Sequence, residues 1–278
     1  MTSRLDGSLD LHLTGMGPPM GAKLDFKAYG AIKPQYYAPI YEKQFDSLRS
    51  KEIALLELGV HRGDSLRMWR DYFEKGPIVG LDLGKSELHD PSGRIRLYQG
   101  KQQDLRLLDR IARENAPSGF DIIIDDCSHL AQLSHQSFSH LFTHHLKLGG
   151  VYVIEDWSLG YWHGWPDGHR PRRSSRRVGS VIRTQIWQIL ERCLETRVMS
   201  RLVASRRKLK FLPVLALYKQ RFPSHSYGMV GWIKQLVDEV GVEAMGYGGG
   251  MFESIEIFQG QVFVKKGRPG VDLTSRPR

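Results

Sequence analysis

The sequence has little cysteine, no long apolar run and no recognisable leader. Its 278 residues include two cysteines, Cys127 and Cys193, in unrelated contexts, which excludes a disulfide scaffold and fits a reducing compartment. No run of eighteen apolar residues occurs, so no membrane-spanning helix is predicted. Residues 1–21 contain glycine and proline and lack the basic-then-apolar pattern of a signal peptide. We therefore expect a cytoplasmic protein without a membrane span.

Acidic residues are outnumbered: 40 Lys and Arg stand against 30 Asp and Glu, a net charge of +10. Such a balance is compatible with nucleic acid, an anionic membrane or an acidic substrate. The basic residues gather at 170–177 and 201–221, so the charge is a regional feature. A hydrophobic content of 41% is that of an ordinary globular protein, and the length suffices for one large domain.

Short apolar segments alternate with amphipathic helices between residues 53 and 266, which indicates a mostly parallel sheet covered on both faces. The helices are expected at about 64–73, 104–114, 132–146, 180–195 and 202–221, with Gly149-Gly150 leading into the fifth strand. The expected strands are Ile53–Leu58, Ile78–Leu83, Arg94–Tyr98, Phe120–Asp126 and Val151–Ile154, followed by a hairpin of Ser254–Phe258 and Gln261–Lys266. This α/β order is that of the class I S-adenosylmethionine-dependent methyltransferases, a Rossmann-like seven-stranded sheet with a C-terminal antiparallel hairpin.

The domain limits follow from this pattern. We expect a partly flexible N-terminal extension at 1–35, a methyltransferase domain at 36–267 and a tail at 268–278. A segment at about 157–225 breaks the alternation and is predicted to be a lid or substrate insertion.

The first strand ends in a glycine-bearing turn, Glu57-Leu58-Gly59-Val60-His61-Arg62-Gly63. Glycines at 59 and 63 permit a tight turn and close approach of a ligand to the backbone. The spacing is neither Gly-x-Gly-x-x-Gly nor that of a phosphate loop. In class I methyltransferases such a turn cradles the amino-acid part of S-adenosylmethionine, although these glycines could serve the strand-to-helix turn alone.

Further cofactor contacts are expected at the ends of the second and third strands. Asp82 can accept both hydrogen bonds of a ribose diol, and a capping role is the weaker alternative because no periodic helix starts there. After Gly100, the amide of Gln102 could lie beside the adenine, whereas Asp104 could simply cap the next helix. The predicted cofactor-binding residues are Glu57, Gly59, Gly63, Asp82, Gln102 and Asp125.

Two acidic pairs, Asp125-Asp126 and Glu155-Asp156, end the fourth and fifth strands. Adjacent strands lie about 4.8 Å apart, so the four acids could converge at the sheet edge where ligands bind. Clustered carboxylates raise one another's pKa, and a cation relieves their repulsion. Oxygen ligands favour magnesium, manganese or calcium over zinc. The alternative is that these acids are only polar strand ends.

Histidines occur in two settings. His129 lies three residues after Asp126, and we assign it as the general base, although a lone histidine is often structural. Others lie further along the chain, on the next predicted helix. No cysteine or carboxylate accompanies them at ligand spacing, so we interpret them as part of a solvated helix face. They are His135, His140, His144 and His145.

Particular sequence blocks carry a family resemblance. They are Leu56–Val60 with Gly63–Trp69, then Phe120–His129, Tyr152–Asp156 and Tyr161-Trp162. In these blocks the chain resembles the metal-dependent sugar O-methyltransferases of macrolide and related polyketide biosynthesis, the mycinamicin and tylosin type. The resemblance covers about residues 36–266. It implies magnesium ligands at Asp126, Glu155 and Asp156, His129 as base, and cofactor contacts at Glu57, Gly59 and Asp82. Tyr36, Tyr37 and Tyr41 fall in the family's aromatic segment.

The chain departs from the family pattern in several places. The Thr-Asp-Lys upstream of the aromatic segment is replaced by Leu24-Asp25-Phe26-Lys27 at a different spacing, which questions closure over the cofactor by that segment. Cys127 replaces a usual Gly, and Lys101 stands where Asp is common. A loop with Arg at 170, 172, 173, 176 and 177 is more basic than the family's and bears on the substrate.

The predicted function is methyl transfer from S-adenosylmethionine to a hydroxyl of a sugar or glycoside, with Mg²⁺ or Mn²⁺ aligning the acceptor. Aromatic side chains of the insertion could stack on the sugar, namely Trp157, Tyr161, Trp162 and Trp165. Methylation of catechol-like phenols is the first alternative. Nucleic-acid binding rests on charge alone and is disfavoured, so we expect no nucleic-acid partner. The sequence leaves open whether the chain forms a homo-oligomer.

Overall fold

The computed structural model describes residues 23–86, 88–168, 225–244 and 251–267. The helices expected at 180–195 and 202–221, the arginine-bearing loop at 170–177, and segments 1–22 and 268–278 lie outside the described residues.

Seven strands form one mixed sheet with the order β3-β2-β1-β4-β5-β7-β6. The strands are β1 (Leu55–Leu58), β2 (Ile78–Asp82), β3 (Ile95–Gln99), β4 (Phe120–Asp125), β5 (Leu146–Glu155), β6 (Phe252–Ile257) and β7 (Gln261–Lys266). The first five pair in parallel, and β7 lies antiparallel between β5 and β6. The predicted mostly parallel sheet with an antiparallel C-terminal hairpin is confirmed.

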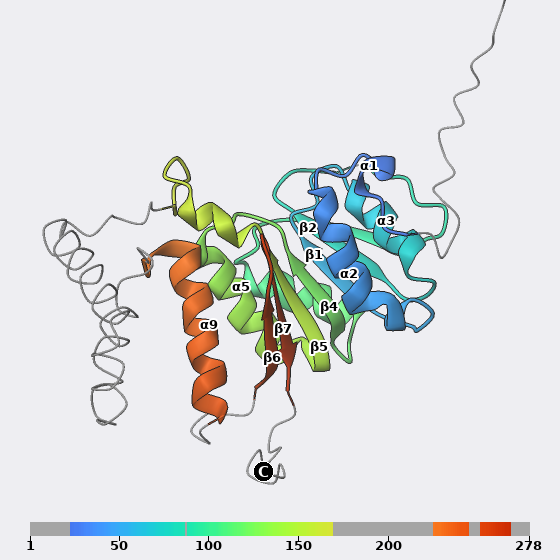
Figure 1. Ribbon diagram of the computed structural model, residues 1–278. Coiled ribbons are helices and arrows are strands. Elements are labelled where there is room, and N and C mark those ends of the chain that lie inside the picture. Colours follow the sequence, from blue (N-terminus) through green and yellow to red (C-terminus); the bar gives the residue numbers. More distant parts are fainter. Residues whose placement is uncertain (1–22, 87, 169–224, 245–250, 268–278) are drawn as a thin grey trace, which may run out of the picture.

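Helices cover both faces of this sheet (Figure 1). They are α1 (Phe26–Tyr29), α2 (Ala38–Phe45), α3 (Asp64–Tyr72), α4 (Leu105–Asn115), α5 (Ala131–His144) and α9 (Gly228–Ala244), with 3₁₀ turns η1 (Gln35–Tyr37), η2 (Asp46–Leu48) and η3 (Trp157–Tyr161). None of the described helices combines the length and the apolar character that crossing a bilayer requires.

Alternation along the strands divides the core into two layers. Ile122, Ile124 and Val153 pack with α1, α2 and α3 on one face. Ile123 and Ile154 pack with α4, α5 and α9 on the other. Apolar side chains on both faces explain why the central strands read as unbroken hydrophobic runs.

The fifth strand begins earlier than expected. We predicted that the preceding helix would reach Leu146 and that Gly149-Gly150 would form the turn into the strand. Instead α5 ends at His144, and Leu146 already pairs with Phe120 of β4. Gly149 has a φ of 76°, and the register shifts along this part of β5, so the glycines lie within an irregular strand.

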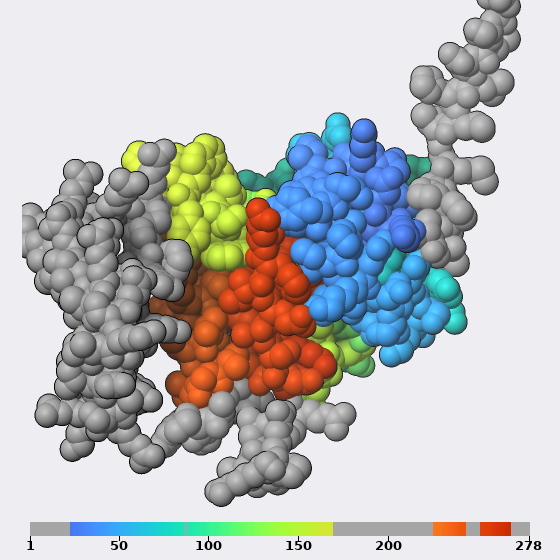
Figure 2. Space-filling view, viewed as in Figure 1, coloured from blue at the N-terminus to red at the C-terminus, as the bar shows by residue number. Residues whose placement is uncertain are grey.

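The segment before Tyr36 is part of the fold and not only an extension. Leu24 and Phe26 are buried in the layer that contains α2 and α3. The Tyr41 ring of α2 lies 5.6 Å from that of Phe263 in β7. Figure 2 shows the blue N-terminal segment packed directly against the red C-terminal hairpin. The two ends of the described chain therefore meet over one face of the sheet.

Asp90 secures the loop between β2 and β3, and this generates a first prediction. Its carboxylate accepts the Ile95 amide at 2.7 Å and pairs with Arg70 at 3.0 Å. Burial alone would raise the pKa of Asp90, but these hydrogen bonds outweigh it and lower the pKa from 3.8 to about 2. Asp90→Asn should cost about 1–3 kcal/mol near neutral pH.

The sign of its pH dependence follows from the lowered pKa. The contribution of Asp90 is complete above the pKa of its unfolded state and is lost as the pH falls toward about 2. Urea unfolding of the wild type and Asp90→Asn should therefore show a stability gap that closes on acidification. A gap that stays constant down to about pH 2 contradicts the assignment.

Candidate active site at the carboxyl edge of the sheet

The site lies where β1, β4 and β5 end side by side. Leu58 is paired with Asp125, and Asp125 is paired with Ile154. Asp126 follows β4 directly and Glu155 is the last residue of β5, so these predicted acids do arrive at one edge. Ligands of open α/β sheets bind at this edge.

Asp125 does not join the other acids. We expected four acids around one point, but successive strand residues face opposite sides of the sheet, and Asp125 points into the layer of α4 and α5. There its carboxylate lies 3.3 Å from the Tyr152 hydroxyl and 3.5 Å from the Gln102 amide. Burial raises its pKa. The expectation of four converging acids is therefore wrong for Asp125.

An unpredicted residue, Lys33, lies at the centre of the remaining acids. Its Nζ is 2.5 Å from Asp126, 2.6 Å from Glu155 and 3.0 Å from Glu57, and its side chain is only 3% exposed. Burial disfavours the ammonium, but the three carboxylates outweigh that penalty and raise the pKa of Lys33. The buried acids thus have an internal cation.

The carboxylates around Lys33 are not fully compensated. Burial raises the pKa of Glu155 to about 8 and that of Asp126 to about 6, despite the attraction of Lys33. Burial also raises the pKa of Glu57. Three carboxylates facing one ammonium favour additional positive charge at this edge.

A second group at the edge consists of Asp126, His129 and Asp156. Each offers one possible ligand atom, and these three atoms lie within 4.8 Å of one another. His129 Nε2 is 3.9 Å from Asp126 Oδ1 and 4.0 Å from Asp156 Oδ2. Two hard carboxylate oxygens fit a magnesium or manganese ion. Glu155 is not part of this group; its carboxylate contacts Lys33 and Tyr41, and its role as a metal ligand stays a prediction.

Backbone strain marks the same place. Within the described ranges, the non-glycine residues with positive φ are His61, His129 and Asp156, with φ values of 48°, 50° and 52°. His61 belongs to the glycine turn after β1, and the other two belong to the ligand group. Left-handed backbone in non-glycine residues is costly and tends to occur at functional sites.

Two tyrosines of the N-terminal segment donate hydrogen bonds to acids at this edge of the sheet. The Tyr37 hydroxyl donates to Asp156 Oδ1 at 2.5 Å, and the buried Tyr41 hydroxyl donates to Glu155. Gly260, in the turn between β6 and β7, lies directly against the Tyr37 hydroxyl. The aromatic segment that the resemblance singled out therefore orients Glu155 at the end of β5 and Asp156 directly after it.

The glycine turn lies beside these groups. Gly59 has a φ of 86°, and a Cβ there would approach the carbonyl oxygen of Asp126 to 2.1 Å, so only glycine fits. Glu57 Oε2 accepts a hydrogen bond from Ser65, whereas buried Oε1 has only the ion pair with Lys33 among the described residues. A pocket runs along the turn, lined by residues 31–33, 59–62, 64–65 and 126. The turn thus borders a pocket with open backbone at Gly59, while the Glu57 carboxylate lies buried behind it against Lys33.

The other predicted cofactor residues have internal partners. Asp82 Oδ2 accepts the amides of Val60 and His61, which ties β2 to the glycine turn. Gln102 is buried, and its carbonyl oxygen accepts the Ser128 amide. Asp104 caps α4 by accepting the Leu107 amide. Gly63 precedes α3 with a φ of 83°. Cofactor contact by Asp82, Gln102 and Gly63 stays a prediction.

Part of the predicted insertion braces the site. Trp165 donates its indole N–H to the His129 carbonyl at 3.1 Å. Asp167 accepts the first amide of α5, from Ala131, at 2.6 Å and that of Met229 in α9 at 3.1 Å. Trp157 donates to Phe258. Trp162 is exposed, and its ring stacks with Trp165.

Sheet order and site together define the class I methyltransferase fold. The MycE methyltransferase from the mycinamycin biosynthetic pathway, solved in complex with Mg and SAH, aligns with a TM-score of 0.57 and 30% identity. The alignment covers 87% of this chain and 53% of that chain. The same enzyme with Mg, SAH and Mycinamycin VI aligns at 29% identity, also with a TM-score of 0.57.

Within that class, the resemblance to sugar O-methyltransferases is confirmed by sequence comparison. The mycinamicin VI 2''-O-methyltransferase of Micromonospora griseorubida is 41% identical over 147 residues. The demethylmacrocin O-methyltransferase of Streptomyces fradiae is 37% identical over 146 residues. Each match covers 50% of this chain and 36% of the relative, so the chain spans about a third of the length of these relatives. No protein-family model matches the chain.

Replacing Lys33 tests whether its ammonium neutralises the buried acids. Lys33→Met should destabilise the protein by about 3–5 kcal/mol at alkaline pH, because it leaves buried carboxylates without their cation. Since burial already raises the pKa of Asp126 to about 6 and of Glu155 to about 8, the penalty should shrink as the pH falls through these values and the acids become neutral. Chemical denaturation across this range measures it.

Lys147→Met is the matched control. Lys147 pairs with Asp121 at 2.8 Å, but both side chains are partly exposed, so the change should cost less than about 1 kcal/mol. An equal loss for the two variants, or a Lys33→Met penalty that does not depend on pH, would show that Lys33 does not neutralise the acids.

Proposed function

We propose that this chain carries out S-adenosylmethionine-dependent, divalent-metal-dependent O-methylation of a sugar hydroxyl in a glycoside. The observation that carries the proposal is the convergence of Asp126, His129 and Asp156 beside the glycine turn, at the ligand-binding edge of a methyltransferase sheet. The related enzymes act on mycinamicin VI and demethylmacrocin, which supports a natural-product glycoside as acceptor. We place the domain at residues 23–267, with 157–225 as its insertion.

The residues present fit the proposed methyl donor. When bound, S-adenosylmethionine supplies an electrophilic sulfonium methyl. Gly59 keeps the backbone open along the pocket, and the family resemblance assigns the amino group to Glu57, whose buried Oε1 is ion-paired with Lys33 here. Asp82 would hold the ribose, and its backbone partners in the turn already fix its position.

The residues also fit a magnesium or manganese ion, which would stabilise negative charge on the acceptor oxygen. Asp126 and Asp156 would hold it through the oxygens that face His129. Tyr37 fixes the second oxygen of Asp156, and Lys33 fixes that of Asp126. With one oxygen of each carboxylate already held, little side-chain freedom is left to lose on binding the ion.

His129 would act as the general base. Its Nε2 faces the two carboxylates, where it can accept the proton of the acceptor hydroxyl as the methyl is transferred. The carboxylates stabilise the imidazolium that results. Trp165 donates a hydrogen bond to the His129 carbonyl. This bond and the left-handed backbone of His129 together orient the His129 ring.

Exposed aromatic rings near the site would receive the sugar. Trp162 is 55% exposed, and Tyr36 packs edge-on against Tyr37 with half of its own surface open. Trp157 and Trp165 use their indole N–H groups inside the protein. We therefore assign sugar stacking to Trp162 and Tyr36 rather than to all four aromatic residues first considered, Trp157, Tyr161, Trp162 and Trp165.

Metal removal is the decisive test. Incubation with labelled S-adenosylmethionine and glycosylated macrolides should give methylated product that disappears with a chelator and returns with Mg²⁺. Asp126→Ala should lose at least about 100-fold in turnover while SAH affinity, measured by calorimetry, changes little. Catechols serve as competing acceptors, and a preference for them would support the phenol alternative. Turnover that is unaffected by chelator rules out the metal assignment.

His129→Ala tests the base separately. The maximal rate should fall by about 10²–10⁴-fold, with a much smaller change in KM, because the base acts in the transition state. The control is His163→Ala, since His163 lies in the insertion and is exposed. Equal losses in rate and in acceptor affinity would assign His129 a binding role only.

A further inference from the structure

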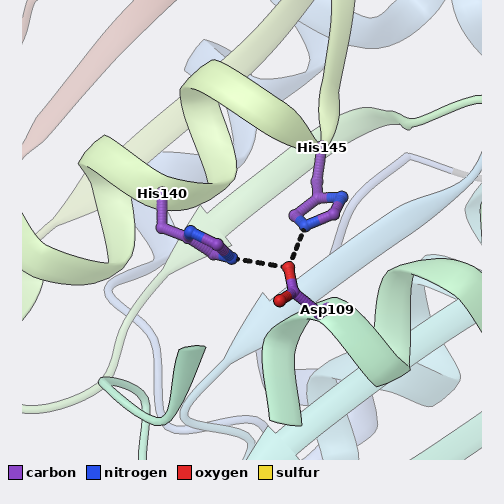
Figure 3. Close-up of side chains that lie close together, drawn as sticks. All are labelled: Asp109, His140 and His145. Carbon is purple, nitrogen blue, oxygen red and sulfur yellow. Dashed lines mark hydrogen bonds and ion pairs between the residues drawn. The ribbon is translucent and has the colours of Figure 1, made fainter. Parts of the chain in front are cut away.

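A second cluster of possible ligands lies away from this site, between α4 and α5. Asp109 projects from α4, His140 from the last turns of α5, and His145 follows the end of α5. Both imidazole Nε2 atoms lie 2.7 Å from the same carboxylate oxygen, Asp109 Oδ1 (Figure 3). This contradicts our interpretation of these histidines as a solvated face, because the carboxylate partner comes from another helix.

The cluster is separate from the proposed active site. His129 lies just before α5 begins, whereas His145 lies just after it ends. Fourteen helical residues span about 21 Å, so the two groups lie near opposite ends of this helix. Nothing in the proposed methyl transfer uses Asp109, His140 or His145.

The scaffold holds the three side chains in place. His145 donates its amide to the Leu141 carbonyl, and its own carbonyl accepts the Phe120 amide at 2.7 Å, which fixes it to the start of β4. On α4, the neighbouring Leu108 is fully buried. The histidine side chains are only 16% and 18% exposed. The three side chains are therefore positioned by α4, by α5 and by the residue fixed at the end of α5, and not by mobile loops.

We propose that Asp109, His140 and His145 form a second metal site, one that binds zinc or a similar transition-metal ion. Two imidazole nitrogens and one carboxylate oxygen are donors that zinc accepts and magnesium does not prefer. The three ligand atoms lie within 4.8 Å of one another. Hydrogen bonds from His145 and His140 lower the pKa of Asp109, so its carboxylate is ionised at neutral pH.

Only a small adjustment would admit the ion. Zinc bonds of about 2.0–2.2 Å in a tetrahedral arrangement separate the ligand atoms by about 3.3 Å. The present 2.7 Å contacts therefore need to open by about 0.6 Å. Asp109 is 37% exposed and has room to turn. Water or the exposed His144, whose ring centre is 5.3 Å from that of His140, would complete the coordination.

Zinc would join α4 to α5 in this arrangement. Because the ion binds the folded protein and not the separated helices, it should raise the melting temperature. The role is structural, and it predicts stabilisation without any need for the methyl donor.

The test is a zinc titration of tag-free, chelator-stripped protein in excess Mg²⁺, with a chromophoric chelator as competitor. The wild type should bind one zinc ion at this site, and bound Co²⁺ should show the intense visible absorption of tetrahedral coordination. His140→Gln and His145→Gln keep an amide that can donate to Asp109 but remove the imidazole. Each should weaken zinc binding at least about tenfold and reduce the zinc-induced rise in melting temperature.

Two controls separate this site from the first. His135→Gln changes an exposed histidine of the same helix and should leave zinc binding unchanged. Asp126→Ala should also retain it. Zinc binding that survives both glutamine substitutions, or that is lost in Asp126→Ala, would overturn the proposal. These outcomes are independent of whether methyl transfer is observed.

Discussion

The geometry of the candidate site depends on one buried ammonium group, that of Lys33, which pairs with three carboxylates. Parallel pairing of β1, β4 and β5 brings Glu57, Asp126 and Glu155 to one edge, where the burial of Glu57 and Glu155 and the partial burial of Asp126 make their charges costly. Lys33 offsets part of that cost, and it does so from the segment between α1 and η1, outside the sheet. The burial of Leu24 and Phe26, and the packing of α2, hold that segment over the site.

Much of the fold could be predicted because local pattern and tertiary structure agree. β2, β3 and β4 match their expected limits within about one residue, since each is a short apolar run between turn signals. The start of β5 was misjudged because a Gly-Gly pair normally marks a turn, whereas here strand pairing continues across it. Helices α1, α2 and α9 were not anticipated: two are short, and α9 follows a stretch dominated by basic residues.

The site residues that could be predicted are likewise those with a local signal in the sequence. Asp126, His129 and Asp156 carry a signal in their position at strand ends, and the structure brings them together. Lys33 carried none, because its partners lie 93 and 122 residues away, and a lysine near the N-terminus is ordinarily a surface residue. The Asp109 cluster was missed for the same reason: its ligands come from two helices, so no spacing in the sequence reveals them. The opposite orientation of Asp125 and Asp126, by contrast, follows from strand alternation alone.

The contact between Gly260 and Tyr37 links the hairpin turn to Asp156, a proposed metal ligand, without touching a ligand itself. With a φ of 86°, Gly260 leaves room for the tyrosine hydroxyl that holds one oxygen of Asp156, and even a methyl group would displace it. The position of the Asp156 carboxylate therefore depends on a residue more than one hundred positions further along the chain. Variation at this turn among relatives would report on the geometry around Asp156, although the turn itself would pass for an ordinary surface loop.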